Sequence, residues 1–538
     1  MEDKSATMED FLKAMDLDRN HADIEKNREC TKALLAEGDR IFDESTLVKT
    51  MIADGSFQEK ISGSTYLLEK ADGVEIKRPI IDLVQQGGTM LGIGLLGYTY
   101  IMEKAGVRFR SMAGTSAGAI NTLLLAAIPH TVYNQQSLFD PKRNAVKSEL
   151  LAYVVANKDF SDFLDRPGKL GELQKWLVRR INKIHSYLPV FGVLLLLGLV
   201  GFSYFLYRVL DHFIFNTRNG LTQHAINNYN FIASIFCAMA VTVLLLVIVL
   251  SLFRKTMGFN PGEAPYKWMK DILATPFVDA LTTEKLMNKK IKEPKPTTLD
   301  ENGKRVELSR DPRLVFITAN LTHNRIVKFP ENSSDYWAKY SQQVCPAAYV
   351  RASMSLPFIF HAFVTDDKYV IGPNDQPVSN TVALSARFVD GGLLSNFPIR
   401  EFHVPPPQIP SYPTFGVLLG SPKAEPQQDS ASLKKKFESL SVFKFILSFI
   451  STFRNFYDYE FLQTHKEFKQ LVNAVNTDQF NSLDFGMPFA TKQAIFSAGA
   501  ATAIKQLESF SWKEYLIVRT ESIPVPKTQN GNITIRSN

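Results

Sequence analysis

The chain has 538 residues, enough for one large domain with additions, and its formal net charge is +7. Its three cysteines lie far apart, which excludes a disulfide framework and a cysteine-ligated metal cluster. A basic balance is typical of proteins that bind nucleic acid or an anionic membrane. The sequence contains no helix-turn-helix, zinc knuckle or aromatic-basic RNA motif, so we expect a membrane and no nucleic acid as partner.

The first 76 residues are charged and are interpreted as an N-terminal helical arm. They begin without a secretory signal, because Met1–Asn20 has no apolar core. Short apolar groups such as Phe11-Leu12 and Ala33-Leu34-Leu35 predict short amphipathic helices. Helices of this kind more often pack against a domain than act as a functional module.

A glycine-rich turn follows the hydrophobic strand predicted over residues 80–84. The turn contains Gly87, Gly88 and Thr89, and it precedes a helix predicted over residues 91–105. Backbone N–H groups in such a turn can hold an oxyanion during acyl transfer. These three residues are therefore candidates for an oxyanion hole, and a plain strand-to-helix turn packed by glycines is the alternative.

A second turn, one β-α unit later, carries Gly114-Thr115-Ser116-Ala117-Gly118, the G-x-S-x-G pattern. It lies between a strand predicted over residues 107–113 and a helix that continues through residues 123–127. A serine in this pattern sits on a sharp bend, where the flanking Gly114 and Gly118 remove Cβ atoms that would clash. The bend places the Ser116 hydroxyl at a helix N-terminus, where developing negative charge is favoured. The two turns together predict a serine nucleophile beside an oxyanion loop.

Two runs without any charged residue follow, at residues 188–207 and 231–253. At about 1.5 Å per residue, each run is long enough to cross a hydrocarbon core of about 30 Å. A pair of buried core helices is the alternative, but two uncharged runs of this length are hard to place in one soluble domain. We therefore predict a transmembrane hairpin within an insertion that spans residues 166–272.

Basic residues near the ends of the two runs predict the orientation of the hairpin. Nine of them flank the outer ends of the runs: Lys169, Lys175, Arg179, Arg180, Lys183, Arg254, Lys255, Lys267 and Lys270. The loop between the runs has two, Arg208 and Arg218. This asymmetry predicts a two-pass integral membrane protein with its catalytic domain and both termini in the cytoplasm. Trp176 and Trp268 either sit at the inner membrane interface or are ordinary packing aromatics.

Beyond the insertion, a polar and proline-rich stretch from residue 264 to residue 311 is expected to lie on the surface. Two alternating runs, at residues 314–319 and 325–329, predict strands joined by a short turn. A further strand, predicted over residues 386–389, delivers Asp390 to a Gly-Gly turn. The last strand is predicted at residues 414–419.

These motifs resemble the patatin-like phospholipase family, which combines a glycine-rich oxyanion loop, a GTSAGA-type serine turn and a later Asp-Gly-Gly. The last is present at residues 390–392, and the stretches 314–330 and 350–360 are similar to the interior of the family's domain. In the family, the region at 350–360 lines the substrate cleft. Phe358 and Phe360 are therefore candidates to contact an acyl chain, with core packing as the more common alternative.

The resemblance implies a Ser–Asp dyad that uses neither a metal nor another cofactor. Asp390 would accept the proton of Ser116, and its alternative role is that of a turn aspartate that caps local N–H groups. The family's oxyanion loop usually contains three glycines, any residue, a basic residue and a glycine. Here Thr89 stands for the third glycine and Leu91 for the basic residue, so the loop keeps its backbone donors and loses a positive charge.

A histidine base is not predicted, although an α/β-hydrolase places serine, acid and histidine in this order along the chain. Two histidines follow Asp390, namely His403 and His465. His403 abuts three prolines, and His465 lies in a charged helical stretch. Neither sits in a recognisable catalytic turn, so both are interpreted as surface or structural histidines.

The C-terminal region is predicted to be helical. Its stretch at residues 433–462 has three lysines near one end and phenylalanines at helical spacing. It is either an interfacial helix or a helix that packs its aromatic face on the core. The last helix is predicted to end near Phe510, before an irregular tail at residues 525–538.

The fold class expected from the resemblance is α/β: a three-layer patatin-like sandwich with a central, mostly parallel sheet, plus the two-helix transmembrane insertion. The resemblance extends from about residue 78 to about residue 420, apart from the insertion. The chain then divides into a helical arm (1–76), a first catalytic part (77–165), the insertion (166–272), a second catalytic part (273–425), and a C-terminal helical region with the tail (426–538).

The function expected is that of a membrane-anchored serine lipid acyl hydrolase. It would cleave fatty-acyl esters of phospholipids or lysophospholipids through an acyl-enzyme, with membrane phospholipid as substrate and the lipid bilayer as partner. A lipid transacylase shares the acyl-enzyme and is one alternative. A catalytically degenerate membrane scaffold or lipid-binding protein is another, and Leu91 in place of a basic residue is the feature that favours it.

Overall fold

The structure is a computed structural model, and it describes residues 6–521 except for several internal gaps. The gaps are 18–19, 72–73, 166–167, 169–170, 173–174, 176–200, 202–257, 301, 374–375, 377, 406, 421–457 and 459. The predicted membrane segment 231–253, and all of 188–207 except Gly201, therefore lie outside the described residues. So do Trp176, most of 433–462 and the tail at 525–538. Among the described helices, none has the length and apolar character needed to cross a bilayer.

Five parallel strands form the centre of the main sheet, in the order β13, β12, β2, β3, β7. Their bounds are β2 (Val74–Gln85), β3 (Arg108–Thr115), β7 (Leu314–Asn320), β12 (Thr414–Leu419) and β13 (Val472–Val475). Both β3 and β7 are buried along their whole length, as expected for parallel strands that are covered on both faces. These strands confirm the four predicted at 80–84, 107–113, 314–319 and 414–419.

Antiparallel strands extend this centre on both sides. On one side β1 (Tyr66–Ala71) pairs with β2, and the short strands β5 (Thr297–Leu299) and β6 (Arg305–Glu307) follow it. On the other side β8 (Arg325–Phe329) pairs with β7, and β11 (Arg387–Asp390) pairs with the opposite side of β7, beyond the end of β3. The prediction of a mixed α/β fold around a mostly parallel sheet is confirmed, and its three-layer arrangement stays a prediction.

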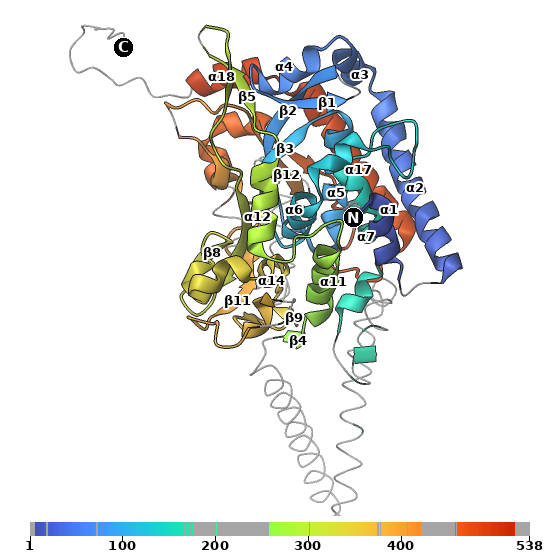
Figure 1. The fold of residues 1–538 in the computed structure, drawn as a ribbon, viewed down its shortest axis with the longest axis vertical. Helices are drawn as coiled ribbons and strands as arrows, with labels where there is room; N and C mark the ends of the chain where they lie inside the picture. Colours follow the sequence, from blue (N-terminus) through green and yellow to red (C-terminus); the bar gives the residue numbers. More distant parts are fainter. Residues whose placement is uncertain are drawn as a thin grey trace, which may run out of the picture.

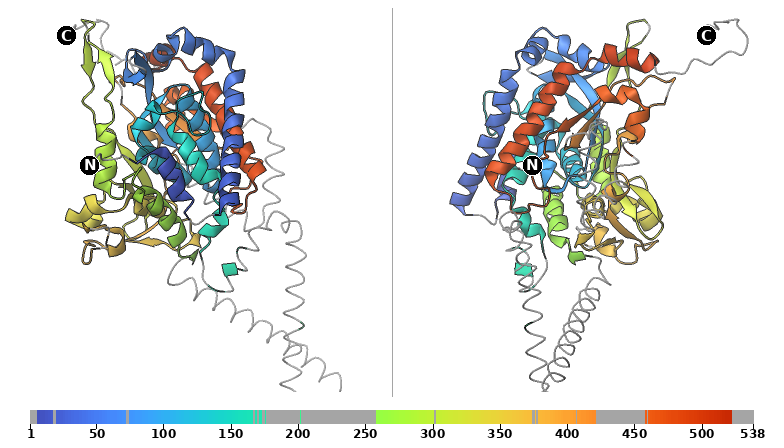
Figure 2. Two further views of the ribbon diagram at one scale, coloured as in Figure 1. Left: turned by 45° about the vertical axis from the view of Figure 1, so that its right-hand side comes forward. Right: turned by 180° about the vertical axis from the view of Figure 1, so that it is seen from behind.

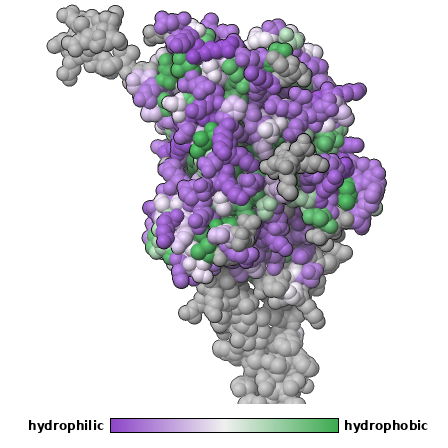
Figure 3. All heavy atoms as spheres, in the orientation of Figure 1, coloured by the Kyte–Doolittle hydropathy of each residue, from purple (hydrophilic) through white to green (hydrophobic). Residues whose placement is uncertain are grey.

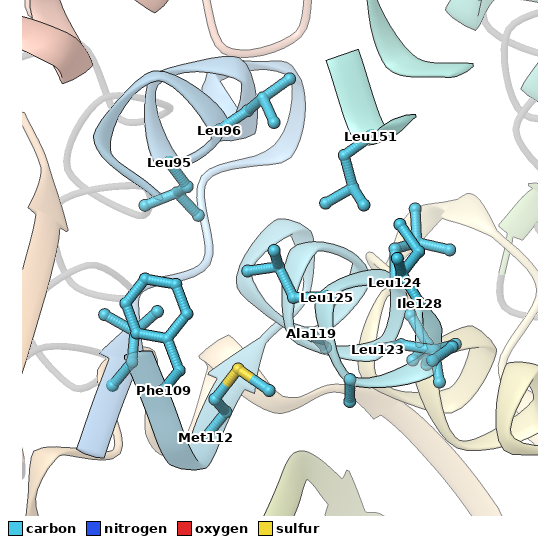
Figure 4. Packing of buried hydrophobic residues seen from close by; sticks show 14 of the residues in the cluster. Leu95, Leu96, Phe109, Met112, Ala119, Leu123, Leu124, Leu125, Ile128 and Leu151 are labelled. Atoms are coloured by element: carbon cyan, nitrogen blue, oxygen red, sulfur yellow. The ribbon is translucent and has the colours of Figure 1, made fainter. Parts of the chain in front are cut away.

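The first two helices of the catalytic part pack on this sheet. Helix α5 (Ile93–Lys104) follows β2, and helix α6 (Ala117–Ala127) follows β3. Figure 4 shows their leucines, among them Leu95, Leu96 and Leu125, directed into one apolar cluster with Phe109 and Met112 of β3. Helix α6 begins directly after Ser116. Because its apolar residues pack in this cluster, the serine turn at its start is held against the core.

The N-terminal arm packs against the domain, as predicted, but its main helix is longer than expected. Helix α2 (His21–Glu44) has 24 residues and lies along α17 (Phe489–Ser509), which Figure 2 shows from behind. Helix α17 in turn packs on α5 at very short range. A Cβ atom on Gly97 would lie 2.0 Å from the carbonyl oxygen of Phe496, so this crossing requires a glycine.

Two predictions about the second half of the chain need correction. The stretch at residues 264–311 is more structured than a surface excursion, because it contains most of α11 (Glu263–Ala274), all of α12 (Thr283–Lys292) and the β5–β6 hairpin. Helix α11 buries Met269, Ile272 and Leu273, an apolar face that its lysines and prolines obscured in the sequence. The helix that ends at Ser509 is also followed by another, α18 (Trp512–Glu521).

In Figure 1 the long axis of the molecule is vertical, so the described structure has an upper and a lower end. Strands β1 and β2 lie near the upper end, and the two-stranded sheet of β4 (Gly258–Asn260) and β9 (Phe358–Phe360) lies near the lower end. The face in Figure 3 is mostly hydrophilic, with small and scattered hydrophobic patches. The large apolar cluster is therefore internal, between the sheet and its helices.

Candidate active site

Ser116 sits on a strained bend between β3 and α6. Its backbone has φ 51° and ψ −116°, a conformation that residues other than glycine rarely adopt. A Cβ atom on Gly114 would lie 2.3 Å from the Gly118 carbonyl oxygen, and one on Gly118 would lie 2.4 Å from the Gln85 carbonyl oxygen. Both glycines of the G-x-S-x-G pattern are therefore needed for close backbone approach, as predicted.

The Ser116 turn is held in place by a second serine, which sequence reasoning missed. The Ser116 amide donates to Ser353 Oγ at 2.9 Å, and Ser353 Oγ donates to the Ile317 carbonyl of β7 at 2.5 Å. Ser353 ends helix α14 (Pro346–Ser353), whose last residues begin the family-like stretch at 350–360. A local signal exists, since small residues surround Ser353, but its partners are remote in sequence.

The glycine-rich loop lies directly against the nucleophile. A Cβ atom on Gly87 would lie 3.1 Å from the Cβ atom of Ser116. The prediction that Gly87 serves as an oxyanion donor needs correction, because its amide donates to the Asn396 carbonyl at 3.0 Å. No acceptor among the described residues takes the N–H of Gly88 or Thr89. Those two amides are the ones available to an oxyanion.

Thr89 occupies the position of the third family glycine and adopts the backbone conformation of a glycine. Its φ is +52°, which is unusual for a β-branched residue. Thr89 begins the 3-10 helix η1 (Thr89–Gly92), whose Leu91 is buried. The side chain that replaces the family's basic residue is thus part of the core, and the loop has kept its backbone path.

Asp390 ends β11 at the same edge of the sheet as Ser116. Strand β7 holds both: β8 pairs with one side of β7, and β3 and β11 follow one another along the other side, where Thr115 is in register with Ile317 and Asp390 with Thr318. Asp390 therefore follows the end of β3 at the next position along β7, beside the serine turn. Asp390 is 4% exposed, its amide donates to the Ser355 carbonyl at 2.9 Å, and Oδ1 accepts the Gly392 amide at 2.7 Å. Its turn-capping contact is therefore present.

The turn after Asp390 connects the aspartate strand to the oxyanion loop through two residues that were not predicted. The Asn396 side-chain amide donates to the Gly87 carbonyl at 3.0 Å. Asp458 accepts the Ser395 hydroxyl at 2.8 Å and the amides of Asn396 and Phe397 at 2.7 and 2.8 Å. Burial raises the pKa of Asp458 to about 6, against the effect of these donors. Asp458 thus positions the turn that contacts the loop.

An apolar cavity with about 740 Å³ of empty space opens at Ser116. Its walls come from the oxyanion loop, α6, the segment just before residue 166, α11 and the region of β9. The lining residues include Thr89, Ile120, Phe160, Phe163, Trp268 and Phe360. Most of these side chains are aliphatic or aromatic. Walls with so few polar groups suit an acyl chain.

Phe360 is confirmed as a wall residue of this cavity, but Phe358 is in neither the cavity nor the core. Phe358 is 68% exposed and has φ 70°. Trp268 contacts Phe163, with 5.4 Å between ring centroids, so its packing role is present, and its place at a membrane interface stays a prediction. His403 and His465 contact each other at 4.9 Å between ring centroids and also pack on Phe461, away from the residues that line the cavity.

Comparisons with known proteins agree with this geometry. The profile of the patatin-like phospholipase family matches residues 83–403, more than half of the chain. The chain belongs to the patatin-like phospholipase family. The matched range contains both glycine-rich turns, Asp390 and the residues 166–272 that were predicted to form an insertion. Membership supports a hydrolase that acts on lipid acyl esters.

Among solved structures, VipD from Legionella pneumophila is similar to this patatin-like chain at 15% sequence identity and a TM-score of 0.31. The alignment covers 83% of this chain and 70% of VipD. A score this low is no basis for inferring function. A search of curated proteins returned no match.

Proposed function

We propose that the protein is a membrane-anchored serine lipid acyl hydrolase, which cleaves fatty-acyl esters of phospholipids or lysophospholipids. One observation carries the proposal: the strained Ser116 turn opens directly onto the large apolar cavity. Strain of this kind persists where the surrounding structure enforces it, and it is concentrated at active sites. An ester carbonyl at Ser116 would have its acyl chain in the cavity.

The proposed chemistry uses Ser116 and Asp390. Asp390 accepts the hydroxyl proton as Ser116 Oγ attacks the ester carbonyl, and the Gly88 and Thr89 amides donate to the resulting oxyanion. The intermediate collapses, the alcohol leaves with the proton from Asp390, and an acyl-enzyme remains. Water then attacks the acyl-enzyme with Asp390 as base, which releases the fatty acid and restores Ser116. The placement of both residues at one sheet edge supports this assignment.

A fluorophosphonate probe tests the nucleophile. The full-length protein in detergent and in phosphatidylcholine vesicles should be labelled, and Ser116→Ala should not. Asp390→Asn should lower turnover by about 10³-fold or more and leave the fold intact, as measured by circular dichroism. Absence of wild-type labelling in both media would favour the scaffold alternative. Acyl transfer to a second lipid, in place of fatty-acid release, would identify a transacylase.

Anchoring through the predicted segments 188–207 and 231–253 is part of the proposal. It is supported by the position of the described residues on either side of the insertion. Phe160 and Phe163 precede the gap, Trp268 follows it, and all three line the acyl cavity. A hairpin that starts there would place the cavity near the bilayer that supplies the substrate.

Alkaline carbonate extraction of cell membranes tests this anchoring. The full-length protein should stay in the membrane pellet, and release into the supernatant would contradict a hairpin. A cysteine at position 218, introduced as Arg218→Cys, should react with a membrane-impermeant maleimide applied to the extracellular or lumenal side of the membrane. Reaction from the cytoplasmic side would reverse the proposed orientation.

A further inference from the structure

A second cavity lies at the opposite end of β3 from Ser116. It has about 360 Å³ of empty space and is lined by the first residues of β3 together with parts of β1, β2, α6 and α12. The seven residue steps from Arg108 to Thr115 correspond to about 23 Å at about 3.3 Å per step. This cavity is therefore separate from the acyl cavity. The proposed hydrolase chemistry assigns it no role.

The polar wall of this cavity is built from buried cations. Arg108, Arg110, Lys147 and Lys290 all line it, and all are at most 6% exposed. Charged side chains are almost never fully buried unless they are paired. Four buried cations around one cavity therefore need negatively charged partners.

Two carboxylates bond to three of these cations. Glu69 receives a bidentate contact from Arg108, at 2.6 and 2.9 Å. Glu293 accepts from Lys147 at 2.8 Å and also from Lys290. Burial alone would raise the pKa of Glu293, but the two lysines outweigh it and lower the pKa to about 2. Both carboxylates are thus charged and already engaged.

Arg110 is the cation without a carboxylate partner within ion-pair distance among the described residues. It is 3% exposed, and its one hydrogen bond runs from Nη2 to the Arg310 carbonyl at 3.3 Å. Nε and Nη1 have no partner. Asp82 is near enough to feel the charge of Arg110, but it accepts the Ser111 amide at 2.8 Å. Two buried donor nitrogens therefore remain unsatisfied beside the cavity.

The charges around the cavity do not balance. The cations are Arg78, Arg108, Arg110, Lys147 and Lys290, and the carboxylates in contact with this network are Glu69, Glu103 and Glu293. Asp82, which is near enough to feel the charge of Arg110, is a fourth carboxylate, and five cations against four leave one positive charge. Burial lowers the pKa of Lys290 to about 8, and the charges of Lys147 and Arg110 act in the same direction. A bound anion would relieve both the excess charge and the unsatisfied donors.

We propose that this cavity binds a small phosphate-type oxyanion, with Arg110 and Lys290 as its principal ligands. Guanidinium and ammonium groups are the side chains that bind such anions, through charge-assisted hydrogen bonds. The opposite wall is apolar and includes Phe109 and Met112 of β3 beside Leu125 of α6, which Figure 4 shows. Free phosphate or the phosphate group of a small organic ester carries the negative charge and the acceptor oxygens that this site lacks.

This site can be tested by thermal unfolding of the full-length protein in detergent. The Tm is compared between solutions of sodium phosphate or pyrophosphate and a sodium chloride solution of equal ionic strength. Wild type should show a saturable rise in Tm of at least ~2 °C with phosphate. Arg110→Met should lose this rise and, because an unpaired buried charge is removed, should have a higher Tm than wild type without phosphate. Arg325→Met, which removes an exposed cation, should respond like wild type.

Equilibrium dialysis with radiolabelled phosphate makes the test independent of folding in the variant. Wild type should bind about one phosphate per chain. No saturable binding up to ~10 mM would overturn the proposal. An equal rise in Tm for wild type and Arg110→Met would also overturn it, since a general salt effect would then account for the stabilisation. Lys290→Met provides a second variant, for which we expect at least tenfold weaker phosphate binding.

Discussion

At the scale of single residues, the site depends on backbone conformations that side chains normally avoid. Thr89 is an example, since its φ of +52° lies in the left-handed region where a Cβ atom costs about 1–2 kcal/mol. The family places glycine at this position, so the loop geometry is retained here in spite of the side chain. The fold around η1 must hold the strained residue in place.

This strain predicts an inverted order of stability for two small substitutions. Thr89→Gly should be more stable than Thr89→Ala by about 1 kcal/mol, whereas glycine is normally the less stable of the two. Urea unfolding of both variants measures the difference. Both should retain ester hydrolysis, because each keeps the Thr89 backbone N–H. An alanine variant that equals or exceeds the glycine variant in stability would show that the strain is absent.

His403 provides a prediction about pH. Burial, with the charges of His465 and Arg519, lowers its pKa to about 4, from 6.5 in an unfolded chain. Between pH 4 and pH 6.5 the unfolded chain therefore binds more protons, so stability falls as the solution is acidified. His403→Phe should flatten this dependence in urea unfolding measured at several pH values, and its turnover should stay within about twofold of wild type. An unchanged slope would contradict the shifted pKa, and a large loss of turnover would make His403 a candidate base.

At the scale of elements, the active-site geometry depends on a turn that is held from a distance. Asn396 follows Asp390 by six residues and contacts Gly87, 309 residues earlier in the chain. Asp458 in turn holds this Asn396 turn through three hydrogen bonds. The turn after Asp390 thus contacts the loop that carries the oxyanion donors through Asn396, and the Asp458 carboxylate holds this turn in place.

Asp458→Asn should lower kcat for ester hydrolysis by about 10- to 100-fold, because a small displacement of positioned groups has effects of this size. An asparagine presents an N–H group to donors that need an acceptor, so unfolding free energy should also fall by about 1–3 kcal/mol. Glu460→Gln is the matched control: Glu460 is two residues away, exposed and paired with Arg400 on the surface. Equal kcat values for Asp458→Asn and the control would remove Asp458 from the positioning of the site.

Local patterns in the sequence were sufficient for the central strands and the nucleophile turn. The strands at 107–113 and 414–419 and the glycines around Ser116 follow from periodicity and steric requirements, which act between near neighbours. The roles of Ser353, Asn396 and Asp458 could not be predicted in this way, because each depends on a partner at least 36 residues away. The engagement of the Gly87 amide by Asn396 was inaccessible for the same reason.

At the scale of the whole molecule, the described ends of the insertion are joined to each other and to the acyl cavity. Asp165 precedes the gap, and its two carboxylate oxygens accept the amides of Gly262 and Ala264, each at 2.9 Å. Buried Arg351 donates to the Gly262 carbonyl at 2.8 Å from the side of α14. The two chain segments that lead into the predicted hairpin are therefore fixed relative to the cavity wall.

This junction predicts that Asp165 matters for substrate delivered from a bilayer and not for the chemical step. Asp165→Ala should lower hydrolysis of phospholipid in vesicles by about tenfold, since the anchor and the cavity would no longer be held in one orientation. Turnover of a water-soluble short-chain ester should stay within about twofold of wild type. Asp162→Ala, which removes an exposed carboxylate paired with Lys158, is the control and should leave both activities unchanged. Equal losses on both substrates would place the effect of Asp165 in the active site, and no loss on either would separate the insertion from substrate delivery.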